Sequence, residues 1–580
     1  MKKLIIILSA VLVVLLIFLA GLFIIEKKQE QNIYVPDTTP PAQTDAATAK
    51  PTTAPTTEPA TEPTTEPVET VPPTTEPPPT YPPFEVTVTE DTDPAKWNVD
   101  WDVIVDSEVV ENFQREEEIF FEDNGYFALP GISTFRGGND RRDASYGTAN
   151  IKNGSISEIW QMYVGAGADS GWFGCGWTGQ PLVVQWDEET KAIMNLYDSK
   201  KEKENLVEVI YGKMDGYVHF IDLEDGSYTR DPIYVGMVFK GSGAIDPRGY
   251  PLLYLGSGIQ SGGKNQTMFV VSLIDGSILY EHSGYDSMAN RWWFGFDGAP
   301  LIDAETDTMV WAGESGLLYT IKLNTEYDKA AGTISVSPDP DIKSRYTHDY
   351  SRRGRYLGYE ASVTGVENYL FVGDNAGLLQ CIDTNTMELI WAQDFTDDIN
   401  CTAAFDWGED HNGYLYVSPS TDYSNGELPI CKVDAQTGEI LWTYTLSCNN
   451  VDGVPGGTLS SPLIGRDGSD IENLVIFSVG RTPSTWSGRM IAFDKDTGEI
   501  VWEYQTGNYM WSSPVALYTE EGKGYVFQAD ASGNCYLLDG ATGEVLNTVC
   551  LNSTVEASPV AFNNTVVIGT RSSMHLLKIS

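Results

Sequence analysis

Beyond residue 83, the apolar residues come in short runs separated by turns rich in Gly, Asp and Asn. No segment of this region keeps a 3.6-residue amphipathic period, so long surface helices are not expected. Short apolar runs bounded by turn residues are typical of β-strands. The pattern therefore predicts an all-β domain.

One hairpin sequence occurs twice in nearly identical form, as DAQTGEILWTY at 434–444 and as DKDTGEIVWEY at 494–504. The Asp of such a turn accepts local backbone N–H groups, and the Gly adopts a positive φ. Related hairpins occur at 381–391 and 537–547, with looser forms at 220–228 and 272–280. These carboxylates, Asp434 and Glu499 among them, are therefore predicted to build turns rather than to catalyse a reaction.

A second element precedes each hairpin, namely a strand with small residues and often Pro at its start. Its eight copies recur every 41 to 62 residues and read GQPLVV at 179, GSGAID at 241, DGAPLI at 297, YEASVT at 359, NCTAAF at 400, LSSPLI at 459, WSSPVA at 511 and EASPVA at 556. Such a period with several short strands predicts an eight-bladed β-propeller. Small residues fit the innermost strand, and Trp391, Trp442 and Trp502 should pack between neighbouring blades from the outer strands.

The two ends of this region predict how the ring closes. The sequence ends on HLLKIS, which corresponds to the third strand of a blade, while ISEIWQMYVG at 156–165 resembles the outer strand GEILWTYTLS. We expect the N-terminal strand to complete the last blade, which leaves no exposed sheet edge.

The N-terminus carries an uncharged apolar run from Leu4 to Ile25. As a helix it would span about 33 Å, enough for a bilayer core of ~30 Å. A cleaved signal peptide is the alternative, but the run is long for one and no small-residue cleavage site follows it. The expected organisation is a membrane anchor at 1–28, a disordered Pro/Thr/Glu-rich stalk at 29–83, an N-terminal extension at 84–155 and the propeller at 156–580. A stalk of this kind suits an outer surface, so residues 29–580 are expected outside the cell.

Charge and cysteine usage exclude several classes of function. Lys and Arg number 36 against 82 Asp and Glu, a net charge of −46, which disfavours nucleic acid and anionic lipid as partners. Seven scattered cysteines form no CxxC motif, so zinc ribbons and thioredoxin-like chemistry are not indicated. Cys535 and Cys550 flank one hairpin and could face each other, although buried free thiols are the simpler interpretation.

The D-x-x-T-G-E-(I/V)-x-W repeats, the S-P-(V/L) strands and the segment TFRGGNDRRDASYG at 134–147 resemble the pyrroloquinoline quinone (PQQ)-like propeller superfamily. This resemblance covers about residues 130–580 and implies the fold. It leaves the function open, because the superfamily holds quinone-dependent dehydrogenases as well as non-catalytic assembly scaffolds.

In the enzymes of this superfamily, the quinone stacks between a Trp and a Cys-Cys disulfide, and Glu, Asn and Asp hold Ca²⁺. This chain has no adjacent cysteines, so no cofactor is expected, with PQQ and calcium as the alternative. Residues 397–400 and 449–453 could offer oxygen ligands to Ca²⁺.

Other catalytic motifs are incomplete. The stretch GIQSGGK at 258–264 resembles a phosphate loop, but Asn265 replaces the required Ser or Thr and a strand follows, so we predict a hairpin turn. The five histidines are dispersed and form no HExxH motif.

The loops that lead into the innermost strands are the most distinctive part of the sequence. They are expected to share one face around the channel mouth, and they concentrate aromatic residues and Arg. The candidate ligand-binding residues are Trp172, Phe173, Trp177, Arg291, Trp292, Trp293, Phe294, Arg352, Arg353, Tyr356, Tyr359 and Trp511. They could instead plug the funnel and lock the blades together.

The function expected from these observations is that of a non-catalytic binding or scaffolding protein. It would be a single-pass protein of the cell membrane, with a cytoplasmic N-terminus and an extracellular propeller that binds a cell-envelope protein or glycan. The alternative is a PQQ- and calcium-dependent oxidoreductase. Aromatic residues at the channel mouth are compatible with both.

Overall fold

The computed structural model describes residues 83–580 except 123–124, 166–172, 176, 409–410, 424–425 and 452–453. The chain divides into two compact units, Met1–Pro78 and Pro79–Ser580, and the second contains every described residue. The apolar run and nearly all of the stalk lie outside the described residues. Within the described residues, no helix is both long and apolar enough to cross a bilayer.

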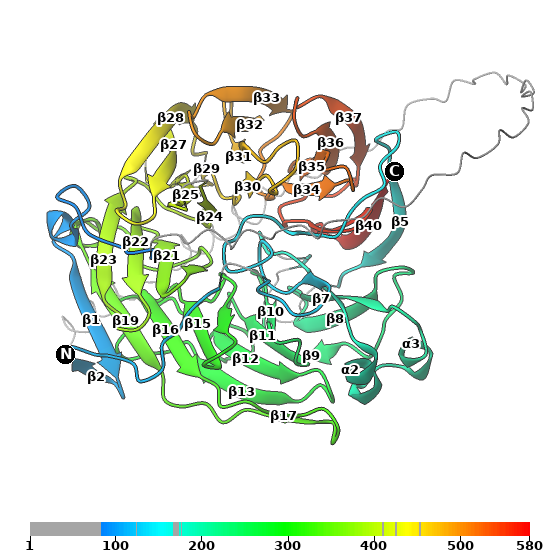
Figure 1. Ribbon diagram of the computed structural model, residues 1–580, viewed down its shortest axis with the longest axis horizontal. Helices are drawn as coiled ribbons and strands as arrows, with labels where there is room; N and C mark the ends of the chain where they lie inside the picture. Colours follow the sequence, from blue (N-terminus) through cyan, green and yellow to red (C-terminus); the bar gives the residue numbers. More distant parts are fainter. Residues whose placement is uncertain are drawn as a thin grey trace, which may run out of the picture. The chain divides into compact units, whose positions relative to one another are not determined.

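Eight antiparallel sheets surround a central axis, as Figure 1 shows, and each sheet is one blade of a β-propeller. The predicted fold is confirmed. Blade 1 consists of β6 (Leu182–Gln185), β7 (Val207–Gly212), β8 (Tyr217–Asp222) and β9 (Ile233–Tyr234), and blade 2 consists of β10 (Ala244–Ile245), β11 (Leu252–Gly256), β12 (Thr267–Ser272) and β13 (Ile278–Ser283). Blade 3 consists of β14 (Leu301–Asp303), β15 (Thr308–Ala312), β16 (Leu317–Lys322) and β19 (Ile342–Thr347), and blade 4 consists of β20 (Thr364–Val366), β21 (Tyr369–Gly373), β22 (Leu378–Asp383) and β23 (Leu389–Asp394).

Blades 5 to 8 continue the same order from the innermost to the outermost strand. Blade 5 consists of β24 (Ala404–Trp407), β25 (Gly413–Val417), β27 (Gly426–Asp434) and β28 (Ile440–Cys448), and blade 6 consists of β30 (Leu463–Ile464), β31 (Leu474–Gly480), β32 (Gly488–Asp494) and β33 (Ile500–Thr506). Blade 7 consists of β34 (Val515–Tyr518), β35 (Gly524–Ala529), β36 (Asn534–Asp539) and β37 (Val545–Cys550), and blade 8 consists of β38 (Val560–Phe562), β39 (Thr565–Gly569), β40 (Ser573–Ile579) and β5 (Ile156–Tyr163).

The smaller elements decorate this ring. They are η1 (Pro94–Trp97), β1 (Asp100–Val105), β2 (Glu108–Val110), β3 (Gly131–Ile132), β4 (Ser145–Tyr146), α2 (Glu188–Ile193), α3 (Asp198–Lys201), the hairpin β17 (Glu326–Asp328) and β18 (Thr333–Ser335), α4 (Asp349–Arg352), and the pair β26 (Ser420–Thr421) and β29 (Gly456–Gly457).

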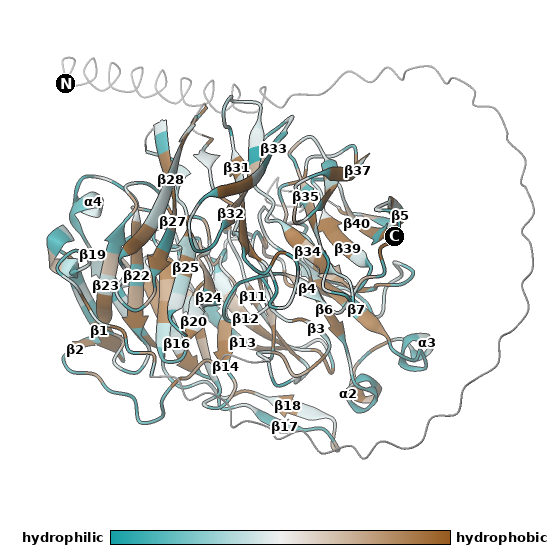
Figure 2. Ribbon diagram, turned by 45° about the horizontal axis from the view of Figure 1, so that its top comes forward, coloured by the Kyte–Doolittle hydropathy of each residue, from teal (hydrophilic) through white to brown (hydrophobic). Residues whose placement is uncertain are grey.

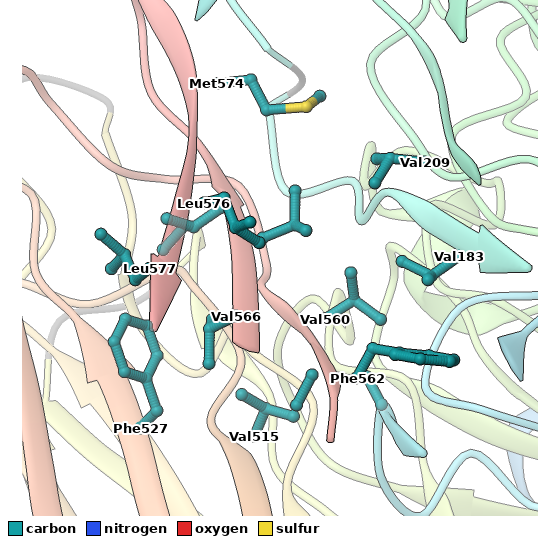
Figure 3. Close-up of a cluster of buried hydrophobic side chains, with 14 of the residues drawn as sticks. Val183, Val209, Val515, Phe527, Val560, Phe562, Val566, Met574, Leu576 and Leu577 are labelled. Carbon is teal, nitrogen blue, oxygen red and sulfur yellow. The ribbon is translucent and has the colours of Figure 1, made fainter. Parts of the chain in front are cut away.

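All eight recurring strand signals fall on the innermost strands, and the N-terminal strand closes the ring. β5 pairs antiparallel with β40 over their whole length, so it is the outer strand of blade 8. Figure 3 shows the seam behind it, where Val183 and Val209 of blade 1 lie near side chains of blades 7 and 8. The closure of the ring is therefore also a continuous hydrophobic core.

Burial along the strands explains the hydrophobic pattern. The third strand of a blade is covered on both faces, and every residue of β12 is buried. The outermost strand has one exposed face, so β37 alternates between half-buried and exposed positions. In Figure 2, β34 and β40 are accordingly largely brown, whereas α3 is teal.

The tryptophans of the outer strands pack against the turn of the next blade, as predicted. The indole Nε1 of Trp391 donates to Ala435 O at 3.1 Å, and the ring lies where a Cβ on Gly438 would meet it at 2.7 Å. Trp160, Trp442 and Trp502 repeat this arrangement with the turns of blades 1, 6 and 7. The Gly of each T-G-E turn therefore supplies both a positive φ and room for the neighbouring indole.

The N-terminal extension, which the sequence left unassigned from 84 to 130, wraps around the ring. Phe84 packs edge-on against Phe405 and Trp407 of blade 5. β1 then adds to the outer edge of blade 3 by pairing with β19, and β2 follows it. The chain next crosses to the axis, which Figure 1 shows as the blue-to-cyan segment.

At the axis, residues 130–146 form what we call the axial belt. Successive residues of the belt bond to the innermost strands in their order around the ring. From blade 1 to blade 8, the hydrogen bonds are Gln185 N to Pro130 O (2.8 Å), Ile245 N to Ser133 O (2.7 Å), Thr134 Oγ1 to Pro300 O (3.2 Å), Gly365 N to Asn139 O (3.0 Å), Phe405 N to Asp140 O (2.8 Å), Ile464 N to Arg142 O (3.2 Å), Ala516 N to Asp143 Oδ1 (3.3 Å) and Ala561 N to Ala144 O (2.9 Å).

Two fully buried arginines hold the belt in place. Arg136 donates to Pro462 O at 2.9 Å and to Pro514 O at 2.5 Å, while Arg141 donates to Val363 O at 2.9 Å. The prolines of the S-P strands thus offer carbonyls to the belt at positions where an N–H is not needed. Burial lowers the pKa of Arg141 to about 10, which still leaves it charged at neutral pH.

Two smaller predictions can also be compared with the structure. All seven cysteines are free thiols and Cys535 is buried, but Cys550 is exposed, because it lies on the solvent side of β37. The stretch resembling a phosphate loop connects β11 and β12, with a bridge between Ser261 and Lys264, and is a hairpin turn as predicted.

Candidate functional site

The antiparallel strand order gives the ring two distinct faces. The loops between blades and the loops between second and third strands share one face, which we call the mouth face. The D-x-x-T-G-E turns lie on the opposite side, the turn face. The four predicted aromatic loops, at 171–181, 291–300, 344–360 and 509–513, all connect one blade to the next and so belong to the mouth face.

The structure exposes some of the candidate residues and buries others. Trp292 is 81% exposed and Tyr356 61%, and Phe173, Trp293 and Arg353 are also accessible. Tyr359, Phe294 and Trp511 are buried and contribute to packing. Trp172 lies outside the described residues.

Arg352 bonds to the N-terminal extension, donating to Asn98 O at 2.6 Å and Asp100 Oδ2 at 2.5 Å. It therefore fastens the extension to α4 rather than facing the channel. The sequence could not show this, because its partners lie about 250 positions away.

Three clusters of aromatic and arginine side chains lie on the mouth face. In the first, the rings of Tyr285, Trp292 and Phe294 contact one another with centroids 5.5 to 6.1 Å apart. Phe294 is buried beneath the other two, which are 48% and 81% exposed. The cluster therefore presents an apolar surface on a fixed base.

The second cluster is built around two arginines. The Arg291 guanidinium lies 4.9 Å from the ring centre of Tyr356, and Tyr356 N donates to Tyr423 Oη at 3.0 Å. Arg355 lies between Tyr350 and Tyr423, at 4.5 and 4.7 Å from their ring centres. These cation–π contacts hold the guanidinium groups against aromatic rings.

The third cluster runs along the opposite blades. Arg481 lies 4.7 Å from the ring centre of Tyr509, which contacts Trp511 at 4.8 Å; Trp511 contacts Trp177 at 5.7 Å, and Arg571 covers Trp177 at 4.9 Å.

Sequence reasoning missed several of these residues. Tyr350 and Arg355 lie within the loop that it singled out, but they were not selected. Tyr423, Arg481 and Arg571 lie on loops between second and third strands, which share the mouth face only because each strand reverses the direction of the chain. Their signal is an Arg or Tyr in the loop that follows the second strand of a blade, between one and six residues beyond the end of that strand.

Beneath the mouth, the axis narrows to a cavity of about 30 Å³. Phe135 of the axial belt lines it, together with small residues from the inner rim. Hydroxyl groups of that rim link one blade to the next, because Ser362 N donates to Thr402 Oγ1, Thr402 N to Ser461 Oγ and Ser461 N to Ser513 Oγ at 2.9 to 3.2 Å. The small residues of the inner strands thus form a series of hydrogen bonds from blade 4 to blade 7, a role that size alone did not predict.

A buried charged group adjoins this cavity. The Lys240 ammonium forms an ion pair with Asp297 Oδ2 and lies 3.9 Å from Glu314 Oε1, and Glu360 lines the same cavity as Asp297. Burial would lower the pKa of Lys240, but the Asp297, Glu314 and Glu360 carboxylates outweigh it, so the pKa is raised. Burial, and then the charge of Asp297, raises the pKa of Glu314 well above its ordinary value.

The second acidic group follows blade 4. Asp398 accepts from Asn375 Nδ2 at 3.0 Å and from Asn400 Nδ2 at 3.1 Å. Burial, followed by the charge of Glu360, raises its pKa well above the usual range. Residues 397–400 thus hold one another and the neighbouring loops.

These donor sets do not fit PQQ with calcium. A cavity of about 30 Å³ is far smaller than the ~300 Å³ or more that a fused-ring cofactor needs. Calcium takes six to eight oxygen ligands, whereas a lysine ammonium lies between the axial carboxylates. Among the described residues, no three or more His, Cys, Asp or Glu side chains converge as a metal site.

Comparison with known proteins gives one family match and relatives of two kinds. Residues 301–508 and 486–580 match the family described as outer membrane protein assembly factor BamB. Quinoprotein ethanol dehydrogenase of Pseudomonas putida is 29% identical over 142 residues, which are 24% of this chain and 19% of that enzyme. The match thus spans about a fifth of the length of this curated relative.

Among solved structures, quinohemoprotein alcohol dehydrogenase ADHIIG from Pseudomonas putida HK5 superposes with a TM-score of 0.53 and 14% identity, covering 80% of this chain and 83% of its own. BamB from Moraxella catarrhalis gives a TM-score of 0.43 and 15% identity, covering 73% of this chain and 98% of its own. Structural likeness at such identity concerns the fold alone.

Proposed function

Because the chain belongs to the PQQ-like β-propeller superfamily, we propose that it acts as a non-catalytic binding or scaffolding protein at the outer surface of a cell membrane. The superfamily by itself assigns no function, since its members bind, assemble or catalyse through sites placed on one fold. The matched family of an outer membrane assembly factor supports the scaffolding role. The mouth face supplies the specific argument.

The observation that carries the proposal is the exposed aromatic surface of the mouth face. Trp292, Tyr356 and Tyr285 expose 81%, 61% and 48% of their surface, although the chain has a packed core elsewhere. Exposed aromatic residues on a fixed base are typical of interfaces, where they bury large area at a small entropic cost. Arg291 already lies against the ring of Tyr356, so little of its conformational freedom is lost on binding.

A protein of the cell envelope is the partner that this surface favours. Trp, Tyr and Arg are the three residue types most enriched at the energetic centres of protein interfaces, and the mouth clusters consist mainly of them. The arginines also offer positive charge in a chain of net charge −46, which favours an acidic patch on the partner. A wall glycan is the other occupant that the experiment below would detect.

The anchoring part of the proposal rests on the apolar run Leu4–Ile25 and on the stalk that follows it. A retained helix would hold the propeller at the extracellular surface with the N-terminus in the cytoplasm. Residues 1–28 should then persist in the mature protein, which should partition with membranes. N-terminal sequencing that begins near the stalk would contradict this part.

The test measures binding of the full-length protein to isolated cell envelopes of the source organism. The double variant Trp292→Ala/Tyr356→Ala should lose at least tenfold in affinity. Phe120→Ala, which truncates an aromatic residue 45% exposed on the N-terminal extension, is the matched control and should bind normally. Protease treatment of the envelopes should abolish binding, while wall-hydrolase treatment should not.

If the double variant binds as the parent does, the mouth face is not the binding site. If only wall hydrolase abolishes binding, the partner is a glycan and not a protein.

The alternative function is a PQQ- and calcium-dependent oxidoreductase, which the local identity to quinoprotein ethanol dehydrogenase favours. The narrow axial cavity and the lysine between its carboxylates argue against it. Alcohol-dependent dye reduction after incubation with PQQ and Ca²⁺ would establish this alternative.

A further inference from the structure

Blades 8 and 1 meet around a second cavity, which is much larger than the one on the axis. Its volume is about 860 Å³, and its lining includes the start of β5, the turn between β38 and β39, the loop between β6 and β7 and the turn after β8. These segments belong to the turn face, and we call the space between them the seam cavity. In Figure 1 the seam between β5 and β8 lies on the right. The seam cavity is therefore separate from the mouth face and its aromatic clusters.

The walls of the seam cavity come from features of this junction. The loop between β6 and β7 of blade 1 runs from 186 to 206 and carries α2 and α3, whereas the corresponding turn of blade 8 is only Asn563 and Asn564. The chain also enters the ring here, and Asn564 holds it. Asn564 Nδ2 donates to Asn150 O, and Asn150 N donates to Asn564 Oδ1, both at 3.0 Å. A long loop, a short turn and the incoming chain thus leave a hollow with fixed walls.

The floor of the seam cavity is apolar. It is formed by side chains of both blades, namely Ile159, Leu223, Phe562 and Leu576. All of these except Ile159 belong to the buried core, and the Trp160 indole fixes the floor by donating to Leu223 O at 2.9 Å. A cavity of this size with an apolar floor and a polar rim is typical of sites for small organic molecules.

The rim of the seam cavity carries an excess of positive charge. Lys203 is neutralised, because its ammonium pairs at 2.6 Å with each of two carboxylates at the end of β8 and in the turn after it. Lys152 and Lys578 are exposed, and neither forms an ion pair within the part of the chain that the structure describes. The remaining carboxylate of the lining is Glu204. The rim therefore offers two ammonium groups against one carboxylate, the reverse of the balance in the whole chain.

We propose that the seam cavity binds a small aliphatic carboxylate, with its hydrocarbon body on the apolar floor and its carboxylate at Lys152 and Lys578. The two ammonium groups favour an anionic head, and each CH₂ removed from water adds to the affinity. The net charge of −46 opposes this only weakly, because at 0.15 M ionic strength charges more than ~8 Å away are largely screened. This site is independent of the partner proposed for the mouth face.

The test is calorimetric titration of the full-length protein with straight-chain carboxylates from butanoate to octanoate in 0.15 M NaCl. Octanoate should occupy one site per chain, and the affinity should rise with chain length by up to about fourfold for each added CH₂. Octanol and octylammonium have the same hydrocarbon body with a neutral and a positive head. Both should bind at least about fivefold more weakly than octanoate.

A double variant tests the recognition of the anionic head. Lys152→Gln/Lys578→Gln should weaken octanoate binding by about fivefold or more and remove the preference for octanoate over octanol. Lys96→Gln/Lys264→Gln is the matched control, because it changes the net charge equally by removing exposed ammonium groups on η1 and on the turn between β11 and β12. This control should bind octanoate as the parent does. An equal loss in both double variants would overturn the proposal, since the effect would then come from net charge.

A second variant tests the floor. Ile159→Asp places a carboxylate among the apolar side chains and should abolish measurable octanoate binding. Val501→Asp is its control, because Val501 also precedes the tryptophan of an outer strand, in blade 6, and is 49% exposed against 47% for Ile159. The two variants should have similar unfolding temperatures, and Val501→Asp should bind normally. Should Ile159→Asp fail to fold, the lysine variants decide the outcome.

Three results would each overturn the proposal. The first is a parent protein without saturable octanoate binding. The second is octylammonium binding as tight as that of octanoate, because the seam cavity would then lack the predicted charge preference. The third is unchanged octanoate affinity in a folded Ile159→Asp protein, because the ligand would then lie elsewhere.

Discussion

On the turn face the same contact occurs four times, whereas on the mouth face no two clusters are alike. Trp160, Trp391, Trp442 and Trp502 each donate to a carbonyl in the next blade and lie over its turn glycine. The mouth clusters instead combine tyrosines, tryptophans and arginines from loops of different length and sequence. Blade-to-blade docking is thus a repeated structural task, and the irregular loops are free to carry a function.

The difference also shows which aromatic residues can be removed at little cost. Trp391 is fully buried, whereas Trp292, which lies on a mouth loop, is 81% exposed. Residue type alone does not predict which of these two tryptophans contributes to stability. Their position relative to the two faces of the ring predicts it.

The largest expected effect comes from removing the segments that join the blades. A chain beginning at Phe84 should fold cooperatively. A chain beginning at Asn150 keeps β5 but lacks the axial belt, and its free energy of unfolding should fall by about 5 kcal/mol or more, because the eight hydrogen bonds of ~1 kcal/mol each between the belt and the blades disappear. A chain beginning at Gly165 also exposes the edge of β40 and should aggregate.

Urea unfolding and size-exclusion chromatography measure these effects. Equal stability of the chains beginning at Phe84 and Asn150 would show that the belt only covers the axis and does not hold the blades.

The next largest effect separates the two faces directly. Trp391→Ala should destabilise the protein by about 3–5 kcal/mol, since it removes a buried indole and its hydrogen bond to Ala435. Trp292→Ala should change stability by no more than about 0.5 kcal/mol. Chemical denaturation of the two variants measures their free energies of unfolding. A large loss of unfolding free energy in Trp292→Ala would show that this residue belongs to the core.

The third prediction concerns pH and the axial carboxylates. Burial raises the pKa of Glu314 above its unfolded value of about 4.3, so its contribution is fully present below that pH and is lost as the pH rises through the folded pKa. Glu314→Gln should therefore stabilise the protein at pH values above the folded pKa of Glu314. The gain should be about 1.4 kcal/mol for each unit by which the folded pKa exceeds the unfolded pKa. The expected result is a flatter curve of unfolding free energy at pH values above about 4.3, and an unchanged slope would contradict it.

The smallest effect tests whether the repeat carboxylates only build turns. Asp434 Oδ1 accepts from Gln436 N at 2.8 Å and Thr437 N at 3.0 Å. Asp434→Asn keeps this acceptor and should be nearly neutral, whereas Asp434→Ala should cost about 1 kcal/mol. Neither should alter binding to envelopes, and a binding defect in Asp434→Asn would point to a functional carboxylate on the turn face.

Much of the fold could be predicted from the sequence because its determinants are local. The T-G-E turns, the small residues of the inner strands and the tryptophan after each turn all lie within a few positions of one another, so their spacing is visible along the chain. Even the closing strand β5 was recognisable, because it repeats the Glu, Ile and Trp of other outer strands. Ring closure follows once eight such units are present.

The site could be predicted only in part. The sequence located the aromatic loops but did not show that Tyr359 and Trp511 are buried whereas Trp292 and Tyr356 are exposed. The burial of a side chain depends on the neighbouring blades that cover it. Likewise, Arg352 bonds to Asp100, far away in the sequence. No local pattern records such partners.

By itself, therefore, the sequence determined the blade, its number of copies and the way the ring closes, since each rests on short-range periodicity. Only the tertiary structure decided what lies on the axis. It brings Arg136 and Arg141 of the belt to carbonyls of distant strands, and it places Lys240 among carboxylates from two later loops. Such contacts arise where loops from all eight blades converge, and the physical reason is that the low dielectric of the axis requires each buried charge to find a partner.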